Sequence, residues 1–315
     1  MPSPLRRRSD LAPLLALLAM TAAWGSTFFL IKDLLVRLPV ADMLALRFGI
    51  GSLALVLLAG RRLRMSRATL RSGLLLGLLY GVAQILQTAG LALTSASVSG
   101  FITGLYVVAT PLLAALLLRT RVSATTWAAS GLATVGLGVL SLNGFALGPG
   151  ELLTLLSALV YAGHIIAMGR LSTPGEALPL SLVQMVVITA VCTVAAVWPG
   201  AGSPGLQLPA STGDWLAVLY LAVVAGALTM VLQTWAQARV EAARAAVVMA
   251  MEPVWAAAFA VTLGDDRLTS RMVAGGLAIL AAMYLVELAP RRRRGRADAG
   301  PTGPATPVDV GRETS

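Results

Sequence analysis

A glutamate and a proline stand side by side inside an otherwise apolar stretch, "VVMAMEPVWAAAFAV" at 247–261. A carboxylate buried without a partner is costly, and a proline inside a helix removes a backbone hydrogen bond. Two interpretations of Glu252 stay open. It is a structural group that binds freed backbone donors or keeps its proton. Alternatively it faces a polar cavity, where it binds a cationic group or exchanges a proton.

Other polar side chains lie in apolar stretches as well. Arg47 costs about 2.5 to 3.5 kcal/mol at the centre of a membrane helix, so it either reaches the membrane surface or holds an anionic group. His164 is either a proton relay or a hydrogen-bonded core residue. We expect Pro111 and Pro253 to kink their helices. The remaining candidates for a cavity wall, each also explicable by packing, are Trp24, Thr27, Gln84, Gln87, Tyr106, Tyr161, Gln184 and Gln233.

These residues must be positioned by helices in a membrane. The chain has 315 residues, of which 57% are hydrophobic and 12% are charged, whereas soluble proteins carry about 25% charged residues. About 20 apolar residues in a helix cross the ~30 Å hydrocarbon core of a bilayer. The predicted fold is an all-α integral membrane protein with ten helices, near 11–31, 40–59, 70–93, 98–118, 124–142, 150–169, 178–198, 214–236, 244–263 and 270–288.

The basic residues predict the orientation of these helices. With the N-terminus in the cytoplasm, nineteen of the 24 Lys and Arg fall on the cytoplasmic side, as membrane proteins prefer. We therefore expect a cell-membrane protein with a basic cytoplasmic segment at 1–10 and a disordered basic cytoplasmic tail at 289–315. The start, "RRRSDLAPLLALLAMTAA", also has features of a signal peptide, but its apolar run continues to Ile31, which favours a first membrane helix. The membrane also explains the net charge of +10 better than nucleic acid does.

The sequence lacks the residue sets that metal sites, nucleotide-binding loops and common catalytic sites require. One cysteine and one histidine cannot form a zinc or haem cluster, and no GxxxxGK[ST] phosphate loop occurs. No Ser/His/Asp set or pair of intramembrane carboxylates is recognisable. We expect no metal, no cofactor and no enzyme activity.

The two halves of the chain resemble each other. Residues 11–142 form the first predicted repeat and residues 150–288 the second, with "ILQTAGLAL" (85–93) matching "VLQTWAQAR" (231–239). Each repeat holds five helices, and because five is odd, the second repeat enters the membrane from the opposite face. Inverted repeats are typical of transporters that open a central site to each side in turn. Aligned pairs are Trp24 with Tyr161, Thr27 with His164, Arg47 with Gln184, Gln87 with Gln233, Thr110 with Glu252, and Pro111 with Pro253.

Four segments resemble the drug/metabolite transporter superfamily, EamA type, and the resemblance covers about 12–288. They are "AAWGSTFFLIK", "LRFGIG", "TSASVSGFITGLYVVATPLLAALL" and "AARAAVVMAMEPVWAAAFAVTLGDDRLT". The chain departs at "LGDDRLT", where the family usually has Leu-Gly-Glu before Leu-Thr. The resemblance implies a ten-helix secondary transporter, commonly an exporter of amino acids or other small metabolites.

The sequence thus predicts a secondary active transporter that exports a small organic metabolite, amino acid or drug by alternating access, with Glu252 as the proton-coupling acid. An uptake permease or facilitator is the alternative, and a membrane-embedded enzyme is a third reading from another class. The expected partners are a small-molecule substrate and the lipid bilayer, without nucleic acid, for a monomer or a homodimer.

Overall fold

A computed structural model describes residues 4–60, 65–94, 96–119, 121–141, 148–197, 206–263 and 268–288. Every regular element in these ranges is a helix, so the all-α prediction is confirmed for them. The predicted tail at 289–315 and the two aspartates of "LGDDRLT" lie outside the described residues.

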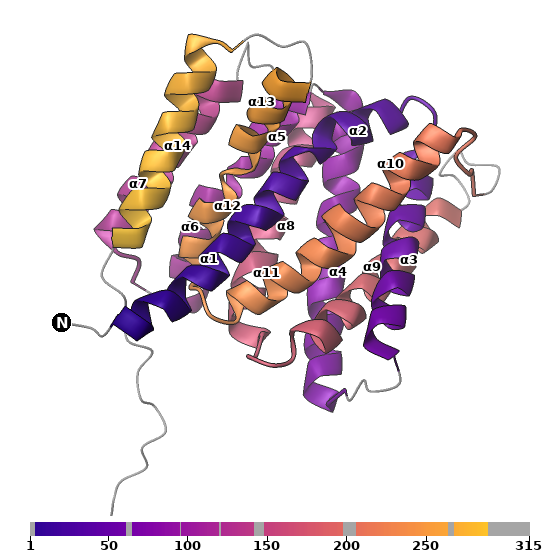
Figure 1. The fold of residues 1–315 in the computed structure, drawn as a ribbon, viewed down its shortest axis with the longest axis horizontal. Helices are drawn as coiled ribbons and strands as arrows, with labels where there is room; N and C mark the ends of the chain where they lie inside the picture. The colour runs from indigo at the N-terminus through magenta and orange to yellow at the C-terminus, as the bar shows by residue number, and fades with distance from the viewer. Residues whose placement is uncertain are drawn as a thin grey trace, which may run out of the picture.

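The first half of the chain contributes seven helices to the bundle (Figure 1). They are α1 (Pro4–Gly25), α2 (Thr27–Leu34), α3 (Val40–Ala59), α4 (Arg67–Leu93), α5 (Ala96–Gly104), α6 (Tyr106–Leu118) and α7 (Ala124–Ser141). The second half contributes α8 (Pro149–Leu171), α9 (Ala177–Val197), α10 (Thr212–Ala222), the π-helix η2 (Val223–Leu228), α11 (Thr229–Gln237), α12 (Ala242–Met249), α13 (Glu252–Leu263) and α14 (Ser270–Leu288).

Eight helical segments of the described chain are long and apolar enough to cross a membrane. They are Leu11–Leu34, Val40–Ala59, Arg67–Leu93, Val98–Leu118, Pro149–Leu171, Ala177–Val197, Thr212–Gln237 and Ala242–Phe259. The other two predicted spans, 124–142 and 270–288, form α7 and α14, which pack against each other at one edge of the bundle (Figure 1). The described apolar part of α14, Ser270–Leu285, is shorter than the eight. The chain is therefore a multi-pass membrane protein, while the count of ten spans stays a prediction.

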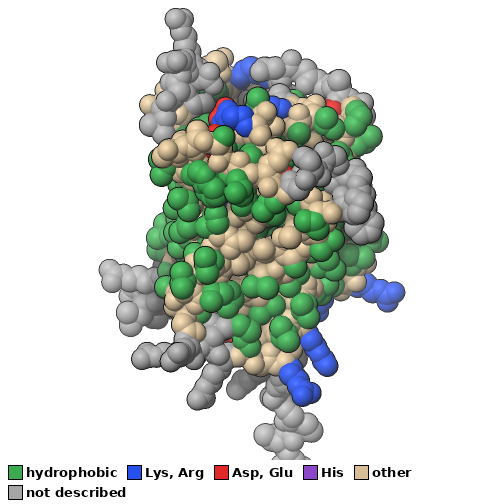
Figure 2. Space-filling view, turned by 90° about the vertical axis from the view of Figure 1, so that its right-hand side faces the viewer, with side chains coloured by type: hydrophobic (Ala, Val, Ile, Leu, Met, Phe, Trp, Pro, Cys, Tyr) green, Lys and Arg blue, Asp and Glu red, His purple; other side chains and the backbone are tan. Residues whose placement is uncertain are grey.

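The outside of the bundle has the character of a surface in contact with lipid. Large apolar side chains such as Leu57, Leu116, Leu216 and Leu277 are exposed, although soluble monomers rarely expose wide apolar patches. Figure 2 shows hydrophobic side chains spread over the middle of one face, with Lys and Arg near its upper and lower ends. This arrangement matches an apolar belt between two polar surfaces.

Several of the membrane spans are interrupted near their middle. The first span breaks between α1 and α2 at Ser26, and the fourth breaks at Leu105 between α5 and α6. The span of α12 and α13 breaks at Ala250 and Met251, directly before Glu252. Such breaks and π-helices leave backbone groups free, and membrane proteins tolerate them where other protein groups or a cavity satisfy them.

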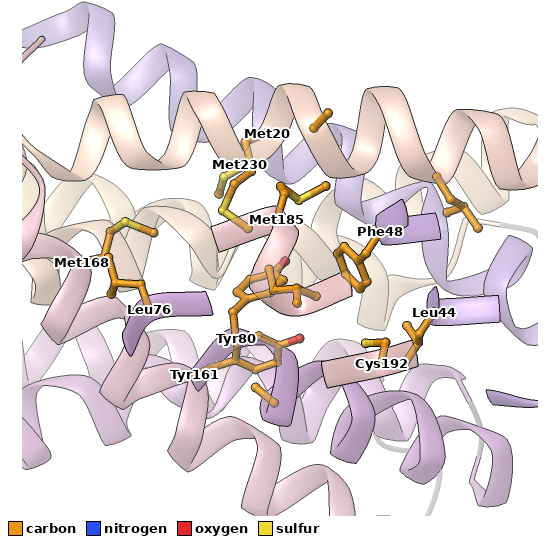
Figure 3. Packing of buried hydrophobic residues seen from close by; sticks show 14 of the residues in the cluster. Met20, Leu44, Phe48, Leu76, Tyr80, Tyr161, Met168, Met185, Cys192 and Met230 are labelled. Carbon is orange, nitrogen blue, oxygen red and sulfur yellow. The ribbon is translucent and has the colours of Figure 1, made fainter. Parts of the chain in front are cut away.

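The centre of the bundle is packed around Tyr80 of α4. Its ring makes edge contacts with Phe48, Tyr161 and His164, at centroid distances of 6.3, 5.6 and 5.1 Å. Figure 3 shows Tyr80 and Tyr161 close together, with Phe48 beside them and methionines around them. These contacts bring α3, α4 and α8 together beside the site described next.

Candidate functional site

A cavity lies in the interior of the bundle, where the interrupted spans meet. Its empty volume is about 600 Å³ with its opening included. The walls come from both halves of the chain and are formed by Trp24, Thr27, Phe28, Ile31, Arg47, Tyr80, Gln84, Gln87, Thr88, Leu91, Thr103, Tyr106, Tyr161, Ile165, Gln233, Met249 and Glu252. Nine of the eleven residues that the sequence suggested for a cavity or for proton coupling are thus brought to one place.

Helical spacing explains which residues of α4 reach the cavity. Residues three, four and seven positions apart lie on one face of a helix. Gln84 and Gln87 share such a face with Tyr80, Thr88 and Leu91, and all five line the cavity. The sequence analysis named only the two glutamines, but extending their face by one turn in each direction would have found the others.

Glu252 is the first residue of α13 and is 8% exposed. No hydrogen bond or ion pair joins its carboxyl group to another described residue. Its backbone lies against α1 so closely that a Cβ on Gly25 would be 2.7 Å from the Glu252 carbonyl oxygen. The acidic residue therefore lies at the contact between two spans, and its side chain has no partner in the described part of the chain.

Arg47 is buried, with 3% of its surface exposed, so it does not extend to the membrane surface. Its Nε donates to the Leu221 carbonyl at 3.2 Å, and an Nη atom lies 3.5 Å from the Ala225 carbonyl. Leu221 is in the last turn of α10, and Ala225 is in the π-helix η2 that follows it. Arg47 and Glu252 line the same cavity, and no ion pair within 4.0 Å joins them among the described residues.

Trp24 contacts the same π-helix from the first span. Its indole Nε1 lies 3.1 Å from both the Ala225 carbonyl and the Thr229 hydroxyl. Thr27, one turn further on, donates to the Trp24 carbonyl at 2.8 Å. Arg47 and Trp24 therefore both reach the carbonyl of Ala225, which also accepts from the Thr229 hydroxyl at 2.8 Å.

A hydrogen-bonded chain crosses another wall of the cavity. Tyr161 donates its hydroxyl to Gln87 Oε1 at 2.9 Å, and Gln87 Nε2 donates to Thr103 Oγ1 at 3.1 Å. Both ends of the Gln87 amide are thereby occupied by protein, and the chain links α8, α4 and α5.

Gln233 and Tyr106 each keep an unused polar atom. Gln233 Nε2 donates to Gln237 Oε1 at 3.0 Å, and Gln237 Nε2 donates to the Ile165 carbonyl at 3.2 Å. The Gln233 Oε1 and Tyr106 Oη atoms are buried without a hydrogen-bond partner. Both residues line the cavity.

His164 and Gln184, two further predicted cavity residues, are not part of the described cavity wall. They are completely buried and bind each other, with His164 Nε2 3.1 Å from Gln184 Oε1. His164 packs behind Tyr80, whose ring stands next to it. His164 lies three positions after Tyr161 and so on the same broad face of α8, but its ring packs against Tyr80 and its Nε2 pairs with Gln184 of α9.

Of the two predicted kink residues, Pro253 follows the break at Ala250 and Met251 and is the second residue of α13. A proline in the first turn of a helix leaves no hydrogen bond unmade. Pro111 lies inside α6, and the break in that span falls earlier, at Leu105.

Charged residues at the ends of the helices connect neighbouring spans. Lys32 Nζ donates to the carbonyls of Leu91 and Thr94 at 2.7 and 2.6 Å, at the C-terminus of α4. Arg37 bridges Asp33 and Asp214, with Nη2 2.5 and 2.7 Å from their carboxylates. Hydrogen bonds to the two carboxylates raise the pKa of the Arg37 guanidinium above its ordinary value. In the described part of the chain, no group of three His, Cys, Asp or Glu could hold a metal ion.

Comparisons with known proteins agree with this architecture. A protein of Archaeoglobus fulgidus described as an uncharacterized transporter is 29% identical over 276 residues, which cover 87% of this chain and 84% of that protein. A solved crystal structure shares the fold, with a TM-score of 0.73 and 19% identity over 89% of this chain and 97% of the other. The EamA-like transporter family matches residues 11–142 and 148–288. The resemblance noted from the sequence is therefore confirmed, and the chain belongs to the EamA-like transporter family of the drug/metabolite transporter superfamily.

Proposed function

We propose that this protein is a secondary active transporter that exports a small organic solute by alternating access. The observation that carries the proposal is the central cavity, whose walls come from both halves of the chain and include the Glu252 carboxyl group, which has no hydrogen bond or ion pair to another described residue. An ionisable group inside a membrane protein normally marks a substrate or ion pathway. Glu252 is the proposed coupling acid, which takes up a proton as the solute leaves. Nothing in this scheme needs a cofactor or an enzyme reaction.

The proposal includes ten spans in two inverted repeats, and the packing of the helices supports it. A twofold axis in the membrane plane would exchange equivalent helices of the two halves. Accordingly, α3 packs against α9 and α7 against α14, which are the paired members of the predicted repeats. In the predicted repeats, α8 is equivalent to α1, and the span of α10, η2 and α11 is equivalent to α4. The contact between α4 and α8 therefore corresponds to the contact between α11 and α1. In the same way, the contact between α4 and α9 corresponds to the contact between η2 and α3.

Two helix N-termini, 145 positions apart, are built alike and support the same symmetry. Ser66 caps α4 by accepting from the backbone N–H of Thr69 at 2.9 Å. Ser211 caps α10 by accepting from the backbone N–H of Asp214 at 3.1 Å. Both serines occupy the favoured capping position, and both bond the third residue of the helix.

The third residue of each helix also binds an equivalent linker from the other half of the chain. Glu176, between α8 and α9, accepts from the Thr69 hydroxyl at 3.0 Å. Arg37, between α2 and α3, donates to Asp214 at 2.7 Å. The first pair lies on the proposed cytoplasmic side and the second on the proposed outer side, given both termini in the cytoplasm and the cell membrane as the location.

The coupling role of Glu252 can be tested in vesicles that contain the purified protein. A comparison of cells with and without the protein, by metabolite and drug-resistance screening, first identifies a solute. Vesicles loaded with that solute and given a pH gradient should then release it faster than vesicles without a gradient. Glu252→Gln should lose this acceleration, because a glutamine side chain cannot carry the proton.

Glu176→Gln is the matched control, since it makes the same chemical change at a helix linker outside the cavity. It should keep the proton dependence of the wild type. Unchanged proton dependence in Glu252→Gln would disprove the coupling role, and net inward flux without any gradient would favour a facilitator. If the wild-type protein moves no solute, with or without a pH gradient, the transport proposal itself is disproved.

A further inference from the structure

The two repeats contribute unequally to the wall of the cavity. Twelve of its seventeen lining residues belong to the first repeat and five belong to the second. On α4 the lining residues extend from Tyr80 to Leu91, which is in the last turn of the helix and so at its proposed outer end. The described cavity therefore extends from the middle of the bundle toward the proposed outer side.

Four polar residues of the second repeat are buried, although their equivalents in the first repeat line the cavity. These four residues, which form the inner polar cluster, are His164, Gln184, Thr234 and Gln237. In the alignment of the repeats their equivalents are, in the same order, Thr27, Arg47, Thr88 and Leu91. The cluster residues are at most 1% exposed and lie toward the proposed cytoplasmic ends of their helices, whereas their equivalents lie toward the outer ends.

The inner polar cluster lies directly behind the cavity wall and is held by hydrogen bonds. His164 Nε2 is 3.1 Å from Gln184 Oε1, and Gln184 Nε2 donates to Thr234 Oγ1 at 3.4 Å. Gln237 Oε1 accepts at 3.0 Å from Gln233, which lines the cavity. The cluster therefore joins α8, α9 and α11 on the proposed cytoplasmic side of the cavity.

A contact that stays closed at all times has no need of polar side chains at these positions. Polar groups are costly to bury, and replacement of a hydrogen-bonded pair by apolar groups of the same shape is nearly neutral or even stabilising. Polar pairs gain an advantage where the contact opens, because water or a solute then takes the place of the lost partner. Hydrogen bonds between membrane helices are also individually weak enough for such an exchange.

The proposed symmetry indicates which residues would be uncovered. If a twofold axis in the membrane plane relates the two halves, an exchange of their arrangements turns the opening to the other side. Residues equivalent to the present wall then become the new wall. Thr110, the equivalent of Glu252, follows the same rule: it is completely buried, is absent from the present wall, and its hydroxyl has no partner among the described residues.

We infer that the inner polar cluster forms the wall of the cavity when the cavity is open to the cytoplasm. This inference rests on the proposed function and names residues that the solute meets as it enters. At these four positions the solute meets an imidazole, two amides and a hydroxyl. The guanidinium of Arg47, whose equivalent is Gln184, lines the cavity only in the arrangement that opens to the outer side.

The inference is tested by the reactivity of single cysteines, which requires no knowledge of the solute. Cys192, the one native cysteine, is first replaced by alanine. Thr88→Cys and Thr234→Cys then make the same change at equivalent positions. Right-side-out and inside-out membrane vesicles are treated with the membrane-impermeant reagent trimethylammonioethyl methanethiosulfonate, and labelling is followed by mass spectrometry. Thr88→Cys should react from the outer side, and Thr234→Cys should react from the cytoplasmic side.

Gln237→Leu distinguishes an opening contact from a merely structural one. It removes the bonds of the Gln237 amide to Gln233 and to the Ile165 carbonyl. Cytoplasmic labelling of Thr234→Cys should become about fivefold faster. Outer labelling of Thr88→Cys should become slower, because the two openings exclude each other. A general loosening of the fold would instead accelerate both reactions.

Ser52→Ala is the matched control. Ser52 Oγ and Thr189 Oγ1 are 2.9 Å apart and join α3 to α9. The alignment that pairs Arg47 with Gln184 also pairs these two residues with each other. A bond between equivalent residues is retained when the two halves exchange their arrangements, so its loss should leave the ratio of the two labelling rates unchanged.

Labelling of folded Thr234→Cys from the outer side, or from neither side, would overturn the inference, as would equal acceleration of both cysteines by Gln237→Leu. If Thr234→Cys does not fold, Leu91→Cys and Gln237→Cys provide the same comparison. If Thr234→Cys stays unreactive while the vesicles move a solute, the transport function stands and only the inner wall is wrong. If labelling is as expected but no solute moves, the transport proposal fails and the two-sided opening remains.

Discussion

Replacement of Gly25 by alanine tests the contact that holds Glu252 in place. The new Cβ would lie 2.7 Å from the Glu252 carbonyl oxygen and from Trp255 Cβ, and 2.8 Å from the Ala256 nitrogen. These atoms belong to the backbone or to a Cβ, so none of them can rotate away. Since ordinary contacts begin at 3.4 Å, α1 and α13 would have to separate by about 0.7 Å, the difference between 3.4 and 2.7 Å.

Overpacking of this kind costs about 1 to 3 kcal/mol. The gain of about 0.5 to 1 kcal/mol from alanine over glycine in a helix offsets only part of it. We therefore expect Gly25→Ala to lower stability by about 1 to 2 kcal/mol and to reduce transport, because the backbone of Glu252 must move.

The assay is thermal unfolding of the purified protein in detergent, followed by transport in vesicles. Gly163→Ala in α8 is the matched control, because a Cβ there meets no atom within 4 Å. The control should be as stable as the wild type or slightly more stable, with full transport. If Gly25→Ala behaves like the control in both measurements, the close contact between α1 and α13 does not exist in the folded protein.

Two further predictions concern the hydrogen bonds around the cavity. Arg47→Met removes the donors to the Leu221 and Ala225 carbonyls, so backbone hydrogen exchange in 221–226 should become about tenfold faster; an unchanged rate there would show that Arg47 does not hold the π-helix. Tyr161→Phe breaks the bond to Gln87 and should lower stability by about 0.5 to 1.5 kcal/mol, measured by thermal unfolding. An unfolding temperature equal to that of the wild type would contradict this bond.

The membrane character and the family could be predicted because both depend on features local to the chain. An apolar segment inserts into lipid according to the summed transfer free energies of its own residues, whichever helices surround it. The same holds for candidate site residues: a carboxyl, a guanidinium and several amides in apolar runs are costly wherever they are buried, so Glu252, Arg47, Gln87 and Gln233 could be singled out by residue type alone.

Their partners could not be predicted, because a hydrogen bond depends on how each helix is rotated and on neighbours far away in the chain. Arg47 binds carbonyls more than 170 positions away, and Trp24 binds one 201 positions away. Nothing in the run 214–236 predicted the π-helix at Val223–Leu228, in or beside which those carbonyls lie. The sequence likewise paired Thr27 with His164, yet Thr27 lines the cavity while His164 binds Gln184 behind Tyr80.

The sequence by itself determined that this chain lies in a membrane, that it is helical and that a few polar groups are buried in it. Only the tertiary structure decided which of those groups have hydrogen-bond partners among the described residues and which do not. The physical reason is that insertion into lipid depends on the residues of one segment, whereas the hydrogen bonding of a polar atom depends on which groups of other helices surround it in the folded protein. Gln87 and Gln233 both occur in the matching Leu-Gln-Thr triplets of the two repeats. Their hydrogen bonds differ, because Gln87 lies between Tyr161 and Thr103 and Gln233 lies beside Gln237.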